Sequence, residues 1–336
     1  MFAKSLVSGF ALLSVVALAG CDDAKQAQTA APTTEQSSAE KPATEKAAEK
    51  QTIVVEHAQG KTEIPSHPQR AFVMNMETLD IIDALGIPVI GVPQTNAHFP
   101  QFLEKYSTSE YVNGGSLFEP AYETISSAKP DVILGGSRAR DAYDKLSGIA
   151  PTISLDIDNK RFIDSLMERT TLLGSLFGKE EQANKLVSDF KNKINDIKGK
   201  TPEAGKAMVI LVSGGKISAY GPGSRFGFIF DVLGFEPAYV FTEDTGRHGN
   251  IVNSELLLKL NPDWLFVIDR DGAIGAKDAQ PAADVLDNAL VRKTSAWEKG
   301  QVVYLDSSAV YIAGGIQTYS QLMDDVNKAL EKKKTN

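Results

Sequence analysis

One phrase of the sequence occurs twice, and it constrains the fold more than any other feature. ETISSAKPDVILGGSR begins at Glu123, and ELLLKLNPDWLFVIDR begins at Glu255. In each copy a short helical pattern ends at a Pro-Asp pair, an apolar run follows, and an arginine closes the phrase. A residue before proline is pushed out of helical geometry, so each helix should end at its proline. The repeat therefore predicts two lobes of similar design.

Short apolar runs alternate with helical patterns along the body of the chain. They are bounded by Gly, Pro and Asp, as is typical of buried strands in parallel sheets. The runs are AFVMN, PVIGV, DVILGG and TISLD in the first half, and AMVILVSG, WLFVID and VVYLD in the second. This pattern predicts an α/β protein with two doubly wound, Rossmann-like lobes.

A charged amphipathic segment separates the two halves. Residues 179–198 would form a helix about 30 Å long, with an apolar stripe on one face. The stripe consists of Ala183, Leu186, Val187, Phe190, Ile194 and Ile197. A surface helix of one lobe would also explain it. The position between the repeats favours a single rigid helix that joins the lobes, with the ligand cleft between them.

The N-terminus predicts export and lipid attachment. An apolar run follows Lys4 and ends in small residues before Cys21, so residues 1–20 have the layout of a secretory signal. The sequence LAGC resembles a bacterial lipobox, in which the cysteine is lipidated and becomes the mature N-terminus. An ordinary signal peptide with a chance cysteine is the alternative. Cys21 is the only cysteine, so no disulfide can form within the chain.

A low-complexity tract follows the lipobox. Residues 22–50 contain no aromatic and no large aliphatic side chain, so the tract cannot bury enough surface to fold. Asp22 and Asp23 resemble the signal that retains lipoproteins at the inner membrane, which predicts anchoring on the periplasmic side of the cell membrane. The expected organisation is a signal peptide (1–20), a lipidated cysteine and tether (21–51), an N-terminal lobe (52–160), a helical segment (161–200) and a C-terminal lobe (201–333).

Three arginines follow strands in a chain whose formal net charge is -8. That acidity argues against nucleic acid as a partner. Arg138 follows DVILGGS, Arg270 follows WLFVID, and Arg225 lies in the loop YGPGSRFG. Ligands bind beyond the carboxyl ends of parallel strands, so these arginines would converge on a cationic cleft for an anion. Arg140 is an alternative to Arg138, and any one arginine could simply cover apolar surface.

Taken together, these features resemble the lipoprotein substrate-binding components of ABC importers whose two α/β lobes are joined by one long helix (class III periplasmic binding proteins). Residues 52–333 and the lipobox carry the resemblance. Within that family the chain looks most like binders of ferric catecholate siderophores. The resemblance implies capture of a ferric siderophore and delivery to an ABC permease with its separate ATPase. It also implies a monomer with no permanently bound cofactor and no enzymatic activity.

In the catecholate binders that this chain resembles, a His and a Tyr of the second lobe contact iron and three Arg surround the catechols. His248 and Tyr311 match the iron-contacting positions, and Arg138, Arg225 and Arg270 match the others. The chemistry is suitable, because Fe(III) is a hard cation that accepts phenolate oxygen and imidazole. A siderophore with two catechols leaves two octahedral positions for such a pair.

Several alternatives stay open at the level of sequence. His248 lies between Arg247 and a glycine and could be an ordinary loop residue, and Tyr319 lies close to Tyr311. Haem would also accept His, Tyr and Arg, and cobalamin is the other ligand of this importer family. An enzyme is disfavoured, since the chain has no nucleophile elbow, P-loop or zinc-protease motif. A structural surface lipoprotein would explain the tether but not a cationic cleft.

Glu123 and Glu255 open the two copies of the repeated phrase. In the importer family, matching glutamates, one per lobe, engage arginines of the permease, and the resemblance assigns these two residues that role. A carboxylate at a helix start is also stabilised by the helix dipole, so capping is the simpler interpretation. Both roles can hold together.

Overall fold

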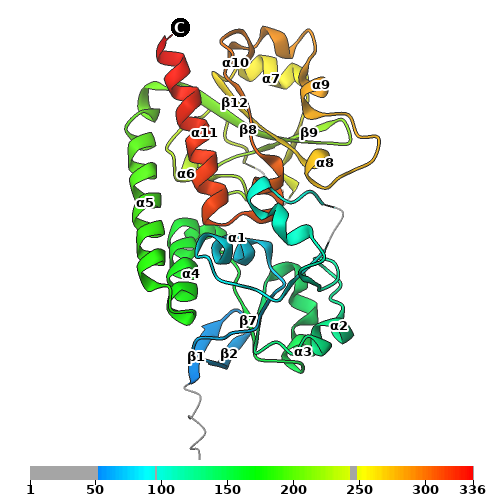
Figure 1. Cartoon of the computed structure of the whole chain (residues 1–336). Coiled ribbons are helices and arrows are strands. Elements are labelled where there is room, and N and C mark those ends of the chain that lie inside the picture. Colours follow the sequence, from blue (N-terminus) through cyan, green and yellow to red (C-terminus); the bar gives the residue numbers. More distant parts are fainter. Residues whose placement is uncertain (1–51, 95–96, 243–247, 336) are drawn as a thin grey trace, which may run out of the picture. The chain divides into compact units, whose positions relative to one another are not determined.

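The computed structural model describes residues 52–94, 97–242 and 248–335, in which helices surround two sheets (Figure 1). The first sheet has the order β5-β4-β3-β6-β7, and all its neighbouring strands are parallel. Its strands are β3 (Ala71–Val73), β4 (Gly91–Val92), β5 (Val112–Asn113), β6 (Val132–Gly135) and β7 (Thr152–Ser154). An antiparallel hairpin of β1 (Thr52–His57) and β2 (Gly60–Pro65) precedes it.

The second sheet has the order β11-β9-β8-β12-β13, and β10 pairs with the start of β8. Its strands are β8 (Lys206–Ser213), β9 (Lys216–Tyr220), β10 (Glu236–Pro237), β11 (Asn250–Val252), β12 (Trp264–Asp269) and β13 (Val302–Tyr304). Strands β8, β12 and β13 are parallel, whereas β9 and β11 form an antiparallel edge. The α/β architecture expected from the apolar runs is confirmed, and a strand lies within each of the seven runs.

The repeated phrase folds in the same way in both lobes. Glu123 is the second residue of α2 (Tyr122–Ser127), and Glu255 is the second residue of α7 (Ser254–Leu260). Each helix ends before its proline, and strands β6 and β12 both begin nine residues after the glutamate.

The aspartate of each Pro-Asp pair holds the neighbouring strand in register. Asp131 accepts hydrogen bonds from the backbone N–H groups of Gln69 (2.8 Å) and Arg70 (3.0 Å), directly before β3. Asp263 accepts one from the N–H of Lys206 at the start of β8 (3.0 Å). In each lobe the aspartate thus satisfies an N–H at the amino end of the adjacent parallel strand.

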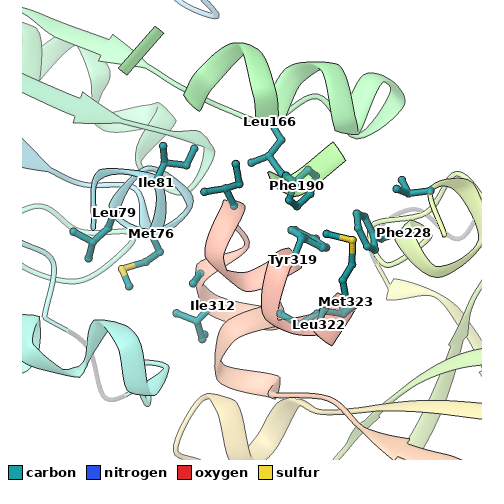
Figure 2. Close-up of a cluster of buried hydrophobic side chains, with 14 of the residues drawn as sticks. Met76, Leu79, Ile81, Leu166, Phe190, Phe228, Ile312, Tyr319, Leu322 and Met323 are labelled. Atoms are coloured by element: carbon teal, nitrogen blue, oxygen red, sulfur yellow. The ribbon is translucent and has the colours of Figure 1, made fainter. Parts of the chain in front are cut away.

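Helix α5 (Glu180–Lys198) joins the two sheets, with α4 (Phe162–Leu176) before it. Four residues of the expected stripe are buried, namely Ala183, Phe190, Ile194 and Ile197. The final helix, α11 (Ile316–Thr335), lies beside α5 (Figure 1). Figure 2 shows Phe190, Phe228, Tyr319 and Met323 in the cluster between these helices and the second lobe, and the Phe228 and Tyr319 rings lie 4.6 Å apart.

Polar contacts run along the same pair of helices. Lys193 of α5 forms an ion pair with Asp324 of α11 (2.7 Å), and seven residues further on, just after α5, Lys200 donates to Asn327 (2.6 Å). The C-terminal part of the joining helix is therefore held by the final helix.

The start of α11 is bound to the first lobe by one buried carboxylate. Asp80 of α1 (Met76–Ala84) accepts hydrogen bonds from the N–H groups of Gly315 (3.2 Å), Gln317 (2.7 Å) and Thr318 (3.0 Å), and from the Thr318 hydroxyl (2.7 Å). Burial raises the pKa of Asp80 to about 6, although these hydrogen bonds favour the charged form. The two lobes are thus connected by α5 and also by the contact between α1 and α11.

The remaining elements are short. They are η1 (Gln101–Ser107), η2 (Ser137–Ala142), α3 (Tyr143–Ser147), η3 (Asn159–Arg161), η4 (Thr201–Glu203), α6 (Phe228–Asp231), α8 (Arg270–Ala273), α9 (Ala282–Leu286), η6 (Val291–Lys293), α10 (Ser295–Glu298) and the π-helical turn η7 (Ala309–Ala313). Within the described residues, none of the helices combines the length and the apolar character needed to cross a membrane.

Candidate ligand-binding site

The three predicted arginines meet at Tyr311, which lies in η7 after β13. Arg270 donates from Nε to the phenol oxygen of Tyr311 (2.9 Å). Arg225 donates to the backbone carbonyl of Tyr311 (2.8 Å), and its guanidinium lies 4.6 Å from the centroid of the phenol ring. Arg138 donates to the carbonyls of Tyr311 (3.2 Å) and Ile312 (3.3 Å). Residues that are more than 170 positions apart in the chain are therefore brought together.

Each arginine is placed by the end of a strand. Arg138 lies in η2 directly after β6, Arg270 begins α8 directly after β12, and Arg225 lies in the loop that follows β9. Arg270 is held further by Ser213 at the end of β8 (3.1 Å) and by an ion pair with buried Asp271 (3.5 Å). Two nearby aromatic rings complete this side of the site, since Phe226 lies under the Arg225 guanidinium and packs on Tyr220.

The second glycine of the motif GGSR allows the first lobe to bring Arg138 close to α1. A Cβ atom at Gly136 would overlap the side chain of Asn75. Asn75 is the N-cap of α1, where its side-chain oxygen accepts hydrogen bonds from the N–H groups of Glu77 (2.8 Å) and Thr78 (3.3 Å). This close approach brings Glu77 and Arg138 to the lining of the same cavity.

The charges of the site shift one another's pKa values. Burial raises the pKa of Tyr311, but the hydrogen bond from Arg270 and the positive charges of Arg270 and Arg225 outweigh it, so the net pKa lies below 10. Burial and the neighbouring Arg225 lower the pKa of Arg138, which stays charged because an arginine starts so high. Burial raises the pKa of Glu77 to about 7, although Arg138 opposes that shift.

A cavity of about 520 Å³ lies between the two lobes beside this cluster, and Arg270 reaches it only through its hydrogen bond to Tyr311. Glu77, Arg138, Arg140 and Asp156 line it from the first lobe, and Arg225 and Tyr311 line it from the second. A neighbouring cavity of about 550 Å³ shares Arg225 and Phe162 with it. A concave site with several guanidinium groups is suited to an anionic ligand.

Arg140 and Tyr319, the alternatives to Arg138 and Tyr311, also line the cavity, but they make different contacts. Arg138 reaches Tyr311, whereas Arg140 is largely exposed and forms an ion pair with Asp156 (3.7 Å). Tyr319 is buried in α11, where it packs on Phe162 and Phe228. The arginines therefore surround Tyr311.

His248 lies two residues before strand β11. It is exposed, and within the described part of the chain no hydrogen bond or ion pair connects its side chain to Tyr311 or the arginines. Gly249 has a positive φ of 67°, and its backbone packs against the ring of Tyr220. Strand β11 pairs with β9 from Asn250 onward, so His248 emerges beside the loop that carries Arg225. Arg247 lies outside the described residues.

The two predicted docking residues lie away from the cavity. Glu123 and Glu255 are both exposed, in the first turns of α2 and α7. Cys21, the signal peptide and the tether lie outside the described residues. No group of three or more His, Cys, Asp or Glu side chains able to hold a metal ion occurs among the described residues.

Two acidic residues of the cavity, Glu77 and Asp156, are absent from the prediction. Both follow strands of the first sheet, because AFVMN precedes Glu77 and Asp156 is the last residue of TISLD. The rule that placed the arginines at strand ends applies equally to these carboxylates. A search for residues of either charge would have found them.

Comparisons with known proteins agree with this architecture. The family model for the periplasmic binding proteins matches residues 73–309. The petrobactin-binding protein YclQ of Bacillus subtilis is 34% identical over 282 residues, which is 83% of this chain and 88% of that protein. Its crystal structure superposes with a TM-score of 0.79, covering 84% of this chain and 99% of that one.

Two further relatives are similar over the same region. The ferric-anguibactin-binding protein FatB of Vibrio anguillarum is 34% identical, over 83% of this chain and 87% of its own length. The periplasmic catecholate-siderophore binding protein VctP of Vibrio cholerae is 32% identical, with a TM-score of 0.77, over 83% of this chain and all of that structure. With two helix-joined lobes and matched over most of its length, the chain belongs to the periplasmic binding proteins, a family of substrate-binding proteins and not of enzymes.

Proposed function

We propose that the protein captures a ferric catecholate siderophore in the cleft between its lobes and delivers it to an ABC permease for iron uptake. The observation that carries the proposal is the meeting of Arg138, Arg225 and Arg270 at Tyr311. Fe(III) with two doubly deprotonated catechols carries one negative charge, and with three it carries three. Guanidinium groups suit both complexes, whereas a neutral ferric hydroxamate gains little from them. The relatives whose names specify petrobactin, anguibactin and catecholates support this class of ligand.

We assign Tyr311 and His248 as side chains that complete the coordination of iron when the siderophore supplies two catechols. The lowered pKa of Tyr311 favours the phenolate that Fe(III) prefers. His248 emerges from a loop beside Arg225 and is exposed, so it must approach the ligand as the complex binds. The metal is cargo that arrives with the siderophore.

The test is a set of titrations of the lipid-free protein, residues 22–336, followed by quenching of tryptophan fluorescence. The ligands are Fe(III) complexes of a bis-catechol, a tris-catechol and a hydroxamate, together with haemin. Replacing Arg225 or Arg270 by Gln should weaken the catecholate complexes about tenfold or more and the hydroxamate much less, because only the anions lose a charge pair. His248→Ala and Tyr311→Phe should weaken the bis-catechol complex more than the tris-catechol complex.

Arg292→Gln is the matched control, since Arg292 is exposed and pairs with Asp287 far from the cavity. It should bind as the unmodified protein does. Equal weakening of anionic and neutral ligands by the cleft variants would contradict the electrostatic account. Binding of haemin alone would transfer the proposal to haem, the alternative ligand of the same importer family.

Delivery is assigned to Glu123 and Glu255, which are exposed at equivalent positions of the two lobes. We propose that each pairs with an arginine of the permease. Glu123→Arg and Glu255→Arg should each reduce uptake of iron by cells while leaving the affinity for the ferric complex unchanged. Unchanged uptake in the double variant would reject the docking role and leave both residues as helix-start acids.

Anchoring is assigned to Cys21, through a lipid on the periplasmic side of the cell membrane. The relatives include proteins named as substrate-binding lipoproteins of Bacillus subtilis, which supports this assignment. A Cys21→Ala variant should fail to incorporate labelled palmitate and should leave the membrane fraction. Retention of the label by that variant would place the lipid elsewhere.

A further inference from the structure

An acidic side chain in a cleft built for anions needs an explanation. Glu77 lies in the first turn of α1, at the lining of the same cavity as Arg138, Arg225 and Tyr311. The close packing of Gly136 on Asn75 holds it there, and its Cγ lies 3.5 Å from the position that a Cβ of Gly314 would occupy. The carboxyl group is thus fixed between the two lobes.

The charged groups around Glu77 come from every element that packs on it. Arg138 from η2 and Arg225 from the loop before α6 attract its negative charge, and Asp156 after β7 repels it. Tyr319 of α11 and Asp80, one turn further along α1, are the other titratable groups nearby. Burial is the largest influence and raises the pKa of Glu77 to about 7.

Asp156 differs from Glu77 in its surroundings. Both of its carboxylate oxygens are buried without a hydrogen bond among the described residues, and its ion pair is with Arg140. The charged side chains that line the cavity are Arg138, Arg140 and Arg225, together with the carboxylates of Glu77 and Asp156. Their formal charge is one positive unit when Glu77 is ionised and two when it is protonated.

We propose that Glu77 sets the charge preference of the cleft, ionised when a weakly anionic complex binds and protonated when a highly charged one binds. This inference rests on the proposed capture of anionic ferric complexes. A complex with three negative charges repels an ionised carboxylate at the same cavity, so its binding drives proton uptake by Glu77. A complex with one negative charge causes a weaker response, and a neutral one causes little.

The residue is accordingly a specificity determinant and also couples capture to pH. Below pH 7 the protonated carboxyl leaves the arginines free to face the anion. Above pH 7 the ionised carboxylate competes with the ligand for Arg138 and Arg225. The affinity for a highly charged complex then falls by up to about tenfold per pH unit from this group.

The experiment compares the dissociation constants of unmodified protein, Glu77→Gln and Glu104→Gln for ferric tris-catechol, bis-catechol and hydroxamate complexes at pH 6 and pH 8. The titration of the ligand itself cancels in the ratio of two proteins at one pH. Glu77→Gln should bind the tris-catechol complex about tenfold more tightly than unmodified protein at pH 8 and about equally at pH 6. The gain should be smaller for the bis-catechol complex and absent for the hydroxamate. Glu104 is exposed in η1 and serves as the matched control, so Glu104→Gln should bind each complex as the unmodified protein does at both pH values.

Proton uptake by the unmodified protein provides a second measurement that does not depend on the folding of a variant. Calorimetric titration with the tris-catechol complex at pH 7.5, in two buffers of different ionisation enthalpy, should show protons taken up by the protein on binding. Glu77→Gln should take up fewer. The inference would be overturned if the ratio of tris-catechol affinities of Glu77→Gln and the unmodified protein were the same at pH 6 and pH 8. Equal proton uptake by these two proteins would also overturn it. Failure of the unmodified protein to bind any catecholate would instead reject the proposed function.

Discussion

At the scale of single residues, Tyr311 organises the cleft. Its ring, its hydroxyl and its carbonyl are each approached by an arginine, so one residue orders the cationic side of the site. Five donor groups on each guanidinium allow it to hold this position and still face a ligand. The tyrosine therefore both supplies a phenol and fixes the geometry of the positive charges around it.

The phenol of Tyr311 should ionise before the other phenols of the protein. Arg270 and Arg225 outweigh the effect of burial and hold its pKa below 10, so a spectrophotometric titration near 295 nm should show one early step. Tyr311→Phe should remove that step, and Tyr239→Phe, which alters an exposed ring, should retain it. An early step that survives in Tyr311→Phe would show that the arginines do not stabilise its phenolate.

At the scale of elements, the ends of strands account for most of what the sequence could predict. Arg138 and Arg270 are predicted because each follows a parallel strand, and parallel strands present their carboxyl ends at one edge. Arg225 follows the antiparallel strand β9, so this rule does not account for its position. The relation of Tyr311 to all three could not be read from sequence, because it depends on the π-helical turn that carries it. The position of His248 depends on a loop rather than on an apolar period, so no pattern in the sequence relates it in space to Tyr311.

Contacts between residues that are far apart in the chain also could not be predicted from the sequence. The Asp80 carboxylate binds the start of α11, more than 230 residues away, and nothing in the local pattern of α1 indicates a buried acid. Strands β1, β2, β5, β9, β10 and β11 lie outside the seven predicted runs, and of these β5, β10 and β11 have only two or three residues, too few to show an alternation. The stripe of α5 was predicted well, since a helix of 19 residues repeats its apolar period several times.

The close packing of Gly136, directly after β6, on the N-cap of α1 leads to a prediction about stability. Gly136→Ala should lower the free energy of unfolding by about 1–3 kcal/mol, because the new methyl group overlaps Asn75. Asn75→Ala alone should lower it by about 1 kcal/mol through the lost N-cap. In the double variant the cost of the Gly136 change should shrink, as denaturant unfolding of all four proteins would show.

Gly148→Ala is the control for that cycle. Gly148 has a negative φ at the end of α3 and only ordinary contacts at a Cβ position, so the change should stay within about 0.5 kcal/mol. Strict additivity of the Asn75 and Gly136 changes would show that the two residues do not compete for the same space.

At the scale of the whole molecule, two raised carboxyl pKa values link stability to pH. The folded protein holds protons on Asp80 and Glu77 that the unfolded chain releases. Their stabilising effect is complete below about pH 4, near the unfolded values, and it is lost as the pH rises through about 6 for Asp80 and about 7 for Glu77. For fully buried Asp80 the total is on the order of 3 kcal/mol.

Urea unfolding at pH 4.5 and pH 8 tests this linkage. Between pH 4.5 and pH 8 the unmodified protein should lose more unfolding free energy than Asp80→Asn does, because the variant has no carboxyl proton to release at this position. Asp189→Asn alters an exposed carboxylate of α5 that pairs only with Lys185, so it should keep the original difference. An unchanged difference in Asp80→Asn would mean that Asp80 has an ordinary pKa in the folded protein.

The contact between Asp80 and the start of α11 also has a consequence for biosynthesis. Helix α11 begins more than a hundred residues after the end of α5, so the ribosome makes the apolar face of α5 well before the helix that covers it. Until then Phe190 and its neighbours lack their partner surface and are open to chaperones and proteases. Synthesis of α11, rather than of the strands of either lobe, is then the event that ends this vulnerable interval, and a ribosome that stops short of residue 316 leaves a product suited to degradation.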